Sequence, residues 1–320
     1  MSRLLALPRE LRDRIIEFAI THQANAPTTL TDVGRRIELE DIEYFSLTSG
    51  RGVQYAADVP STSPLALLAV NRQIRAETCE AIRRLSLTCE CDVIIANEDS
   101  LYVTWTYVPP IFKPLKAMWP NLDRDGPEFQ ELLRDFKVIF TIRMHGIFTP
   151  TAAEPRSGFE DLLEGPNNDI VGPGRVICGF CALFERFLRV GPGTYPVSSR
   201  NFDRNETIGY AQLNILTPPS AEQEGLLPRT LGPHHAPEYR RNHDSRALIH
   251  PETLLEMLTN WFWVSEIFED EELGPKPIGL LLCRVYELSH AVDGSVHVTF
   301  SNPNLDGDWE ADQEREVSPD

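Results

Sequence analysis

Two pairs of closely spaced cysteines are the first residues in this sequence that could carry chemistry. Cys178 and Cys181 form a C-x-x-C pair, and such a pair at a helix start can lower a thiol pKa and support redox reactions. The apolar spacing around this pair instead places it inside a helix, without the rest of a thioredoxin-like pattern. Together with Cys89 and Cys91, four thiolates could bind zinc, but the C-x-C half has poor spacing for that metal. We therefore expect neither redox activity nor a metal site.

Histidines and known catalytic motifs give no stronger signal. His234, His235 and His243 lie in a Pro-rich stretch without carboxylates at ligand spacing, which is typical of a solvated loop. The sequence contains no P-loop, G-x-S-x-G elbow, H-E-x-x-H or G-x-G-x-x-G motif. We therefore expect no catalytic residues and no cofactor, and we interpret the chain as a non-enzymatic protein.

The overall composition is that of a folded protein with an acidic surface. Hydrophobic residues make up 42% of the 320 residues, and the formal net charge is -18. This charge argues against general affinity for nucleic acid or anionic membranes, because both require clustered Lys and Arg. The longest apolar run, around 278–283, is too short to span a membrane. Six irregularly spaced cysteines suggest reduced thiols, so we expect a soluble protein of the cytoplasm or nucleus.

The chain opens with an amphipathic segment, "LLALPRELRDRIIEFAI". Pro8 suits the first position of a helix, because the N–H that proline lacks would be unpaired there in any case. Leu11, Ile15 and Phe18 recur at helical spacing, whereas charged residues, Arg12 among them, fill most of the other positions and predict a solvated face. The segment therefore predicts a helix over 8–20 whose apolar face needs a partner, either in the same chain or on another protein.

A second helix is predicted over 64–85, where apolar residues that include Ile74 follow one helical face. Between the two helices, the segments 35–47 and 51–57 have the composition of a β-hairpin. We expect the two helices to pack against each other across this hairpin.

From residue 91 onward the pattern changes to strands interleaved with helices, which favours a mixed sheet covered by helices. Alternating apolar residues predict strands over 100–108, 136–144 and 210–216, and the Asp293-Gly294 turn leads into another strand. Apolar residues at helical spacing predict helices over 176–190, 250–268 and 277–292.

The fold class is therefore expected to be α+β, in three parts. Residues 1–90 form a helical unit with an inserted hairpin, and residues 91–305 form a mixed α/β domain. Residues 306–320 hold seven acids and one Arg, which is typical of a solvated, disordered tail.

Two motifs in the first part are similar to those of the large fungal group of F-box-like proteins. The stretches are "LPRELRDRII" at 7–16 and "LLAVNRQIRAET" at 67–78, and the family pattern is LPxELRxxI, an insert, then a helix reading roughly LLxVCRQIRxE. The match covers about the first 90 residues. In this chain 50 residues separate the two motifs, whereas an ordinary F-box keeps its helices close together, and Ile74 stands where the later helix of an ordinary F-box usually carries Trp.

This resemblance implies an F-box-like helical unit that docks on a Skp1-like protein of a cullin-based ubiquitin ligase, followed by a domain that recruits an unidentified target protein. Carried over by position, the partner-facing residues would be Leu7, Pro8, Leu11 and Ile15. The alternative is an F-box-derived scaffold or binding module that has lost ligase docking.

Overall fold

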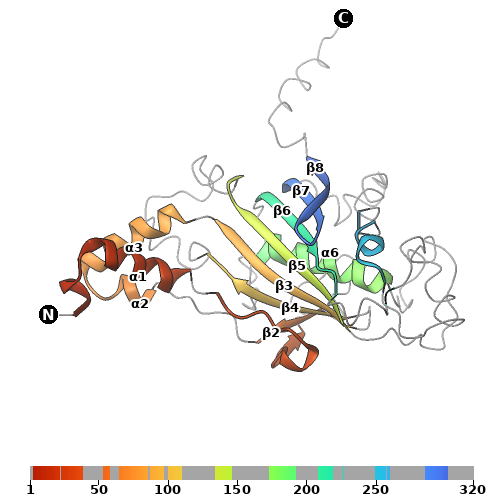
Figure 1. The fold of residues 1–320 in the computed structure, drawn as a ribbon, viewed down its shortest axis with the longest axis horizontal. Coiled ribbons are helices and arrows are strands. Elements are labelled where there is room, and N and C mark those ends of the chain that lie inside the picture. The colour runs from red at the N-terminus through yellow and green to blue at the C-terminus, as the bar shows by residue number, and fades with distance from the viewer. Residues whose placement is uncertain are drawn as a thin grey trace, which may run out of the picture.

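The computed structural model shows an α+β protein whose described part is built on a mixed eight-stranded sheet (Figure 1). The fold class predicted from the sequence is therefore confirmed. The structure describes residues 3–21, 23–38, 53–57, 65–85, 87–96, 100–109, 134–145, 173–191, 208–218, 226, 249–256, 258–259 and 285–301.

The sheet combines a parallel centre with antiparallel edges. Its strands are β1 Arg36–Glu38, β2 Val53–Ala56, β3 Thr88–Ala96, β4 Ser100–Tyr107, β5 Lys137–His145, β6 Ile208–Ile215, β7 Val285–Val292 and β8 Ser295–Ser301. They lie in the order β1-β2-β4-β3-β5-β6-β7-β8. β3, β5, β6 and β7 run parallel, and the hairpins β3–β4 and β7–β8 flank them. Parallel neighbours need crossover connections, which explains the helices between these strands.

Successive side chains of β5 alternate between buried and more exposed positions, and so they distinguish the two faces of the sheet. Its buried side chains are those that the sequence predicts to share one face, namely Val138, Phe140, Ile142 and Met144. The strand register places Cys91, Leu213 and His290 in the same row as Phe140. The next row consists of Asp92, Thr141 and Asn214, which point to the opposite side because successive side chains alternate. One face of the sheet is therefore apolar and the other is largely polar.

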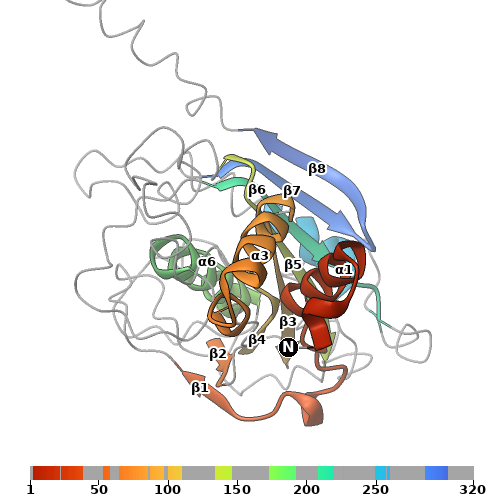
Figure 2. The ribbon, with the colours of Figure 1, turned by 90° about the vertical axis from the view of Figure 1, so that its left-hand side faces the viewer.

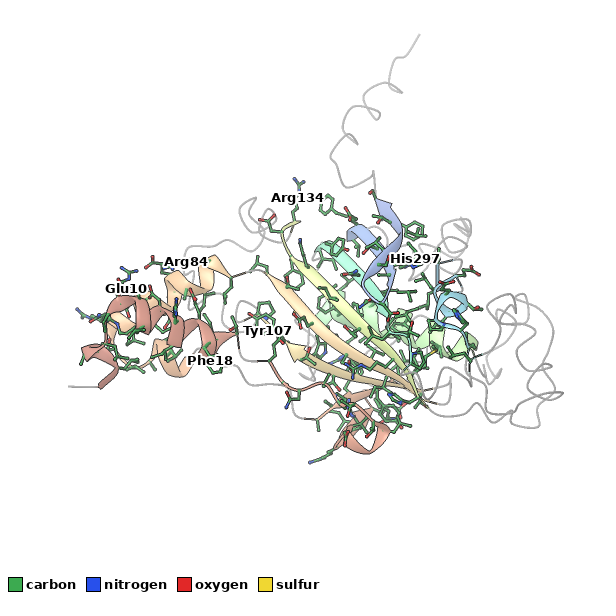
Figure 3. The ribbon with its side chains drawn as sticks, in the orientation of Figure 1. Glu10, Phe18, Arg84, Tyr107, Arg134 and His297 are labelled. Carbon is green, nitrogen blue, oxygen red and sulfur yellow. The ribbon has the colours of Figure 1, made fainter. Side chains whose placement is uncertain are left out.

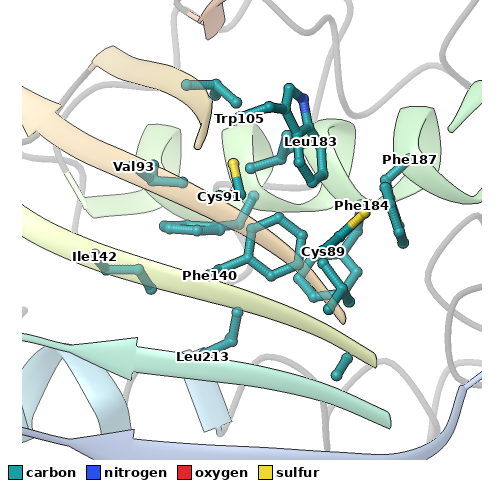
Figure 4. Packing of buried hydrophobic residues seen from close by; sticks show 14 of the residues in the cluster. Cys89, Cys91, Val93, Trp105, Phe140, Ile142, Leu183, Phe184, Phe187 and Leu213 are labelled. Carbon is teal, nitrogen blue, oxygen red and sulfur yellow. The ribbon is translucent and has the colours of Figure 1, made fainter. Parts of the chain in front are cut away.

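Helix α6 (Pro173–Val190) covers the apolar face and forms the main core with it. Phe184 packs on Phe140, with ring centroids 4.7 Å apart, and Phe187 stacks on Trp105 at 5.3 Å. Figure 4 shows these rings between the helix and the strands. The helix predicted over 176–190 is confirmed, although it begins earlier, at Pro173, the kind of position that proline tolerates. The helix ends at Val190, and the following Gly191 has a φ of 87°, as is typical of a glycine that terminates a helix.

The N-terminal helices pack as a pair at one end of the molecule (Figures 1 and 2). A 3₁₀ turn over Arg3–Ala6 precedes α1 (Arg9–Ile20), and α2 (Leu65–Leu68) precedes α3 (Arg72–Arg84). The predicted packing of the first helix on the second is confirmed, because α1 contacts α3. Pro8 occupies the N-cap position and so lies just outside the helix that it was expected to begin.

The helix predicted over 64–85 is interrupted, which corrects the sequence interpretation. Asn71 has an extended backbone, with φ of -165°, and its Oδ1 accepts a hydrogen bond from the Ile74 N–H at 2.9 Å. This is an N-cap, and an asparagine at such a position starts a new helix instead of continuing the previous one. Ile74 lies in the first turn of α3 and is buried, as the apolar pattern predicts.

The predicted hairpin is present as the antiparallel pair β1–β2, with Ile37 opposite Tyr55. The chain between these two strands lies outside the described residues. β2 also pairs in parallel with β4, so the hairpin extends the same sheet that the later strands form. The boundary expected at residue 90 falls within β3.

The helix predicted over 277–292 is wrong for its second half, which forms strand β7. Leu288 and Val292 face the core together with His290, while Glu287 and Ser289 belong to the other face. The helix is predicted because Arg284 and Glu287 fall in both alternating sets of positions, but β7 begins only at Val285 and Glu287 belongs to the polar face. The Asp293-Gly294 turn then leads into β8, as predicted, with positive φ at both residues. The first half of the predicted helix lies outside the described residues.

The helix predicted over 250–268 is described in part. Residues 251–256 are helical, and the buried Leu254 and Leu258 belong to the core on the apolar face. The remainder of this prediction lies outside the described residues, as does the acidic segment 306–320. Within the described part of the chain, no helix is both long and apolar enough to cross a membrane.

Candidate docking surface on the N-terminal helix

The side of α1 that packs on α3 is built around a charged residue. The buried residues of α1 are Arg12, Ile16 and Ile20. Arg12 donates hydrogen bonds to both carboxylate oxygens of Glu77 on α3, from Nε at 2.9 Å and from Nη2 at 2.6 Å. Such a bidentate pair fixes the relative orientation of its two partners as well as attracting them. The sequence interpretation assigned Arg12 to a solvated face, and the structure corrects that.

Arg12 also holds the chain in front of the helix. Its Nη1 donates to the carbonyl oxygen of Leu7 at 2.5 Å, so one guanidinium ties the turn before α1 to α3. Hydrogen bonding from Arg12 lowers the pKa of Glu77 below its ordinary value, and Gln73 contributes a further bond at 3.1 Å. The turn that carries Leu7 and Pro8 is therefore positioned by the same contact that joins the two helices.

The opposite side of α1 carries an exposed apolar stripe, which we define as Leu11, Ile15 and Phe18. Their side chains are 47%, 44% and 75% exposed, respectively. Successive helical residues are about 100° apart, so Leu11 and the buried Ile16 point about 140° away from each other. The apolar face expected from the sequence is therefore not the face that packs on α3. Phe18 projects outward from the helical pair (Figure 3).

The four residues assigned by position to a partner surface lie in α1 or just before it. Pro8, Leu11 and Ile15 are exposed, and Leu7 is half-buried. Phe18 was recognised as apolar in the sequence but was not assigned to this surface, although its spacing of three residues from Ile15 places it on the same stripe. Large apolar residues gathered on one exposed face are a signal of binding, whereas singly scattered ones are ordinary.

Charged residues lie at the junction of the two helices, outside the stripe. Arg9 pairs with Glu80 of α3, and Glu80 also pairs with Arg84 at 2.7 Å. These pairs are about half exposed, so each contributes little to stability. The stripe itself is therefore free to be desolvated without breaking the ion pairs described here.

The cysteines of β3 are part of the core. Cys89 and Cys91 are buried against α6, and burial raises the pKa of both thiols well above its ordinary value. A thiol in such a place stays protonated and is a poor nucleophile. The side chains of Cys178 and Cys181 lie outside the description, as do His234, His235 and His243. Among the described residues, no three His, Cys, Asp or Glu side chains are grouped to hold a metal ion.

No protein-family model matches the chain, and searches of curated proteins and of solved structures give no significant match. What the stripe can bind therefore has to be inferred from its geometry and from the two sequence motifs.

Proposed function

We propose that this protein is a non-enzymatic, F-box-like adaptor that docks on a Skp1-like protein through α1. The observation that carries the proposal is the exposed stripe of Leu11, Ile15 and Phe18, on the side of α1 that faces away from α3. Leu7 and Pro8 precede α1 in the chain, where Pro8 is exposed and Leu7 is half-buried. All of these residues except Phe18 belong to the LPxELRxxI motif that resembles the F-box-like family.

The physics of the stripe favours a partner of protein nature. Burying a large apolar side chain stabilises an assembly by roughly 1.5 to 3 kcal/mol, and clustered anchors of this kind dominate protein interfaces. An amphipathic helix presents such anchors at spacings of three and four residues, which Leu11, Ile15 and Phe18 reproduce. The ion pair between Arg12 and Glu77 holds α1 rigid on α3, so the free side is already ordered before binding.

The sheet domain would then recruit the target protein. Its apolar face is filled by α6, so a target would bind elsewhere on this domain. The alternative function, an F-box-derived scaffold without ligase docking, is favoured by one observation. The chain that follows α1 enters the sheet as β1 and β2 before α3 begins, whereas an ordinary F-box keeps its helices close together.

The deciding experiment is a titration of the purified chain with a purified Skp1-like protein, measured by calorimetry. We expect the double variant Leu7→Ala with Pro8→Ala to bind more weakly than the wild type while its thermal melt stays close to that of the wild type. Ile74→Ala serves as the fold control, because truncating this buried side chain should destabilise the fold by roughly 2 to 5 kcal/mol.

Val296→Ala provides a matched surface control. Val296 is 51% exposed and lies on β8, so its truncation removes exposed apolar area without touching α1. Binding should be unchanged in this variant. If the wild-type chain does not bind the Skp1-like protein, the adaptor proposal fails and the scaffold alternative replaces it.

A further inference from the structure

The segment between α1 and β1 lies along the sheet, and we call residues 23–36 the strap. Its first contact is the Ala24 N–H, which donates to the Thr106 carbonyl of β4 at 2.8 Å. At its other end, Arg36 donates to the Val103 carbonyl at 2.6 Å and to Thr104 Oγ1 at 2.9 Å. Thr104 neighbours Asp92 in the register, so the strap crosses the polar face of the sheet, the face opposite α6.

The middle of the strap is held by Arg143 of β5. Pro27 is buried, and its carbonyl accepts a hydrogen bond from Arg143 Nη1 at 3.1 Å. The other terminal nitrogen, Nη2, lies 2.9 Å from Asp92 Oδ2 of β3. Arg143 is 25% exposed, whereas Asp92 is 3% exposed. One guanidinium therefore stands between the strap above it and a buried carboxylate below it.

The carboxylate of Asp92 is poorly satisfied in this position. Its contact with Arg143 is an ion pair without hydrogen-bond geometry, and no other described group donates to either oxygen. A buried charge with so little compensation carries much of its desolvation cost. Burial raises the pKa of Asp92 to about 6, although Arg143 and Arg36 act in the opposite direction.

Charged and titratable groups near this site come from every described element around it. Arg143 and His145 lie on β5, and Arg36 of β1 lies over the ring of Tyr102 on β4. Glu90 lies on β3, where it accepts a bond from Gln23 of the strap. Asp32 of the strap bonds to Thr28 and Thr29, and the bonds from these two hydroxyls lower its pKa. Asp92 is the buried carboxylate of this group.

We propose that the strap opens and closes over the polar face of the sheet, and that proton uptake by Asp92 favours the closed state. With the strap closed, Asp92 is cut off from water and its neutral form is preferred. With the strap open, water reaches the carboxylate and its ionised form is preferred. Because α1 leads directly into the strap, closing also limits how far the docking helix can move relative to the sheet. This proposal does not depend on Skp1 docking.

The sign of the effect follows from linkage. The state that binds the proton more tightly is favoured as the pH falls, and here that is the closed state. If the open state restores the ordinary pKa of 3.8 from a closed value of about 6, the closed-to-open ratio rises up to about tenfold between pH 7 and pH 5. A lower pH therefore favours the closed strap. In a simple exposed ion pair, by contrast, a lower pH protonates the carboxylate and weakens the contact.

Amide hydrogen exchange of the full chain, resolved at single residues by NMR, tests the proposal. The Ala24 amide reports strap opening, and the Tyr210 amide, bonded to the Phe136 carbonyl within the sheet, reports opening of the core. After correction for intrinsic exchange, we expect Ala24 to be less protected than Tyr210, because it exchanges through opening of the strap alone, and we expect Ala24 protection to be up to about tenfold higher at pH 5 than at pH 7. Unchanged or lower Ala24 protection at pH 5 would overturn the proposal.

Two variants separate Asp92 from the rest of the strap. In Asp92→Asn the pH difference should disappear, with Ala24 as well protected at pH 7 as the wild type is at pH 5. Glu90→Gln is the matched control, because it changes the carboxylate bonded to Gln23 and leaves Asp92 in place, so the pH difference should persist. Persistence in Asp92→Asn would refute the role of that carboxylate. The wild-type comparison needs no variant and remains decisive if Asp92→Asn fails to fold.

Discussion

The helical pair α1–α3 and the core between α6 and the sheet use opposite kinds of contact. At the α6 interface, aromatic rings stack on one another, and Trp105, Phe140 and Phe187 form a continuous cluster. At the α1–α3 interface, a bidentate ion pair between Arg12 and Glu77 lies beside Ile16 and Ile20. α6 therefore keeps its large apolar residues inside, whereas α1 leaves three of its largest outside.

This difference shows how similar apolar patterns can serve different purposes. The spacing of Phe180, Phe184 and Phe187 in α6 and that of Leu11, Ile15 and Phe18 in α1 both predict amphipathic helices. The partner of α6 is a sheet strand with matching apolar residues, so the face is covered within the chain. The partner of α1 within the chain contacts the other side of the helix, so its apolar face remains exposed.

The largest expected loss of stability comes from truncating a side chain in the core between α6 and the sheet. Phe140→Ala should destabilise the fold by about 3 to 5 kcal/mol, because it removes a ring that contacts Phe184 at 4.7 Å and leaves a cavity. Urea unfolding, followed by fluorescence of the tryptophans, measures the loss. A loss below about 1 kcal/mol would mean that α6 is not firmly packed on the sheet.

The core was also the part of the fold most open to prediction from sequence. The strict alternation of apolar residues in β5 and their helical spacing in α6 reflect burial on one face. The strand and the helix that these patterns predict are both present. The helix predicted in place of β7 rests on Arg284 and Glu287, which fall in both alternating sets of positions, yet the strand begins only after Arg284. Within the strand, His290 occupies an apolar row, where its Nδ1 lies 2.6 Å from Thr259 Oγ1. That hydrogen bond depends on a helix from elsewhere in the chain, and local spacing carries no information about it.

A second prediction concerns the pH dependence of stability, to which a buried group on each face of the sheet contributes with opposite sign. On the polar face, the raised pKa of Asp92 means that stability is highest at low pH and falls as the pH rises from about 4 to about 6. On the apolar face, burial lowers the pKa of His290 from 6.5 to about 4, so stability is lost as the pH falls through that same range. Each contribution is about 1 to 3 kcal/mol, and the two oppose each other.

Urea unfolding of the wild type and of two variants, at pH 4.5 and pH 7, measures these contributions. Relative to the wild type, His290→Gln should shift the balance of stability toward pH 4.5, and Asp92→Asn should shift it toward pH 7. Comparing differences between the two pH values removes the constant cost of each substitution. Shifts of the same sign in both variants would contradict the assignment of opposite roles.

The candidate surface was predictable in part from sequence. The positions of Pro8, Leu11 and Ile15 followed from the motif, and the structure leaves all three exposed. The burial of Arg12 and its bond to Glu77 could not be predicted, because a charged residue on a helix is solvated by default and its partner lies 65 residues away. The strap was equally hidden, since Pro27 and Arg143 are 116 residues apart.

The smallest expected effect on the free energy of unfolding is at the exposed stripe. It tests directly whether one side of α1 is exposed while the other is buried. Phe18→Ser should change the free energy of unfolding by no more than about 0.5 kcal/mol, because a side chain that is 75% exposed leaves no cavity and Ser and Phe have similar helix propensities. Ile16→Ala is the matched variant two residues away. Ile16 is fully buried, so its truncation should cost about 2 to 5 kcal/mol. Urea unfolding of both variants distinguishes the two sides of α1. Equal losses would mean that the chain itself covers the stripe, and a covered stripe could not anchor a partner.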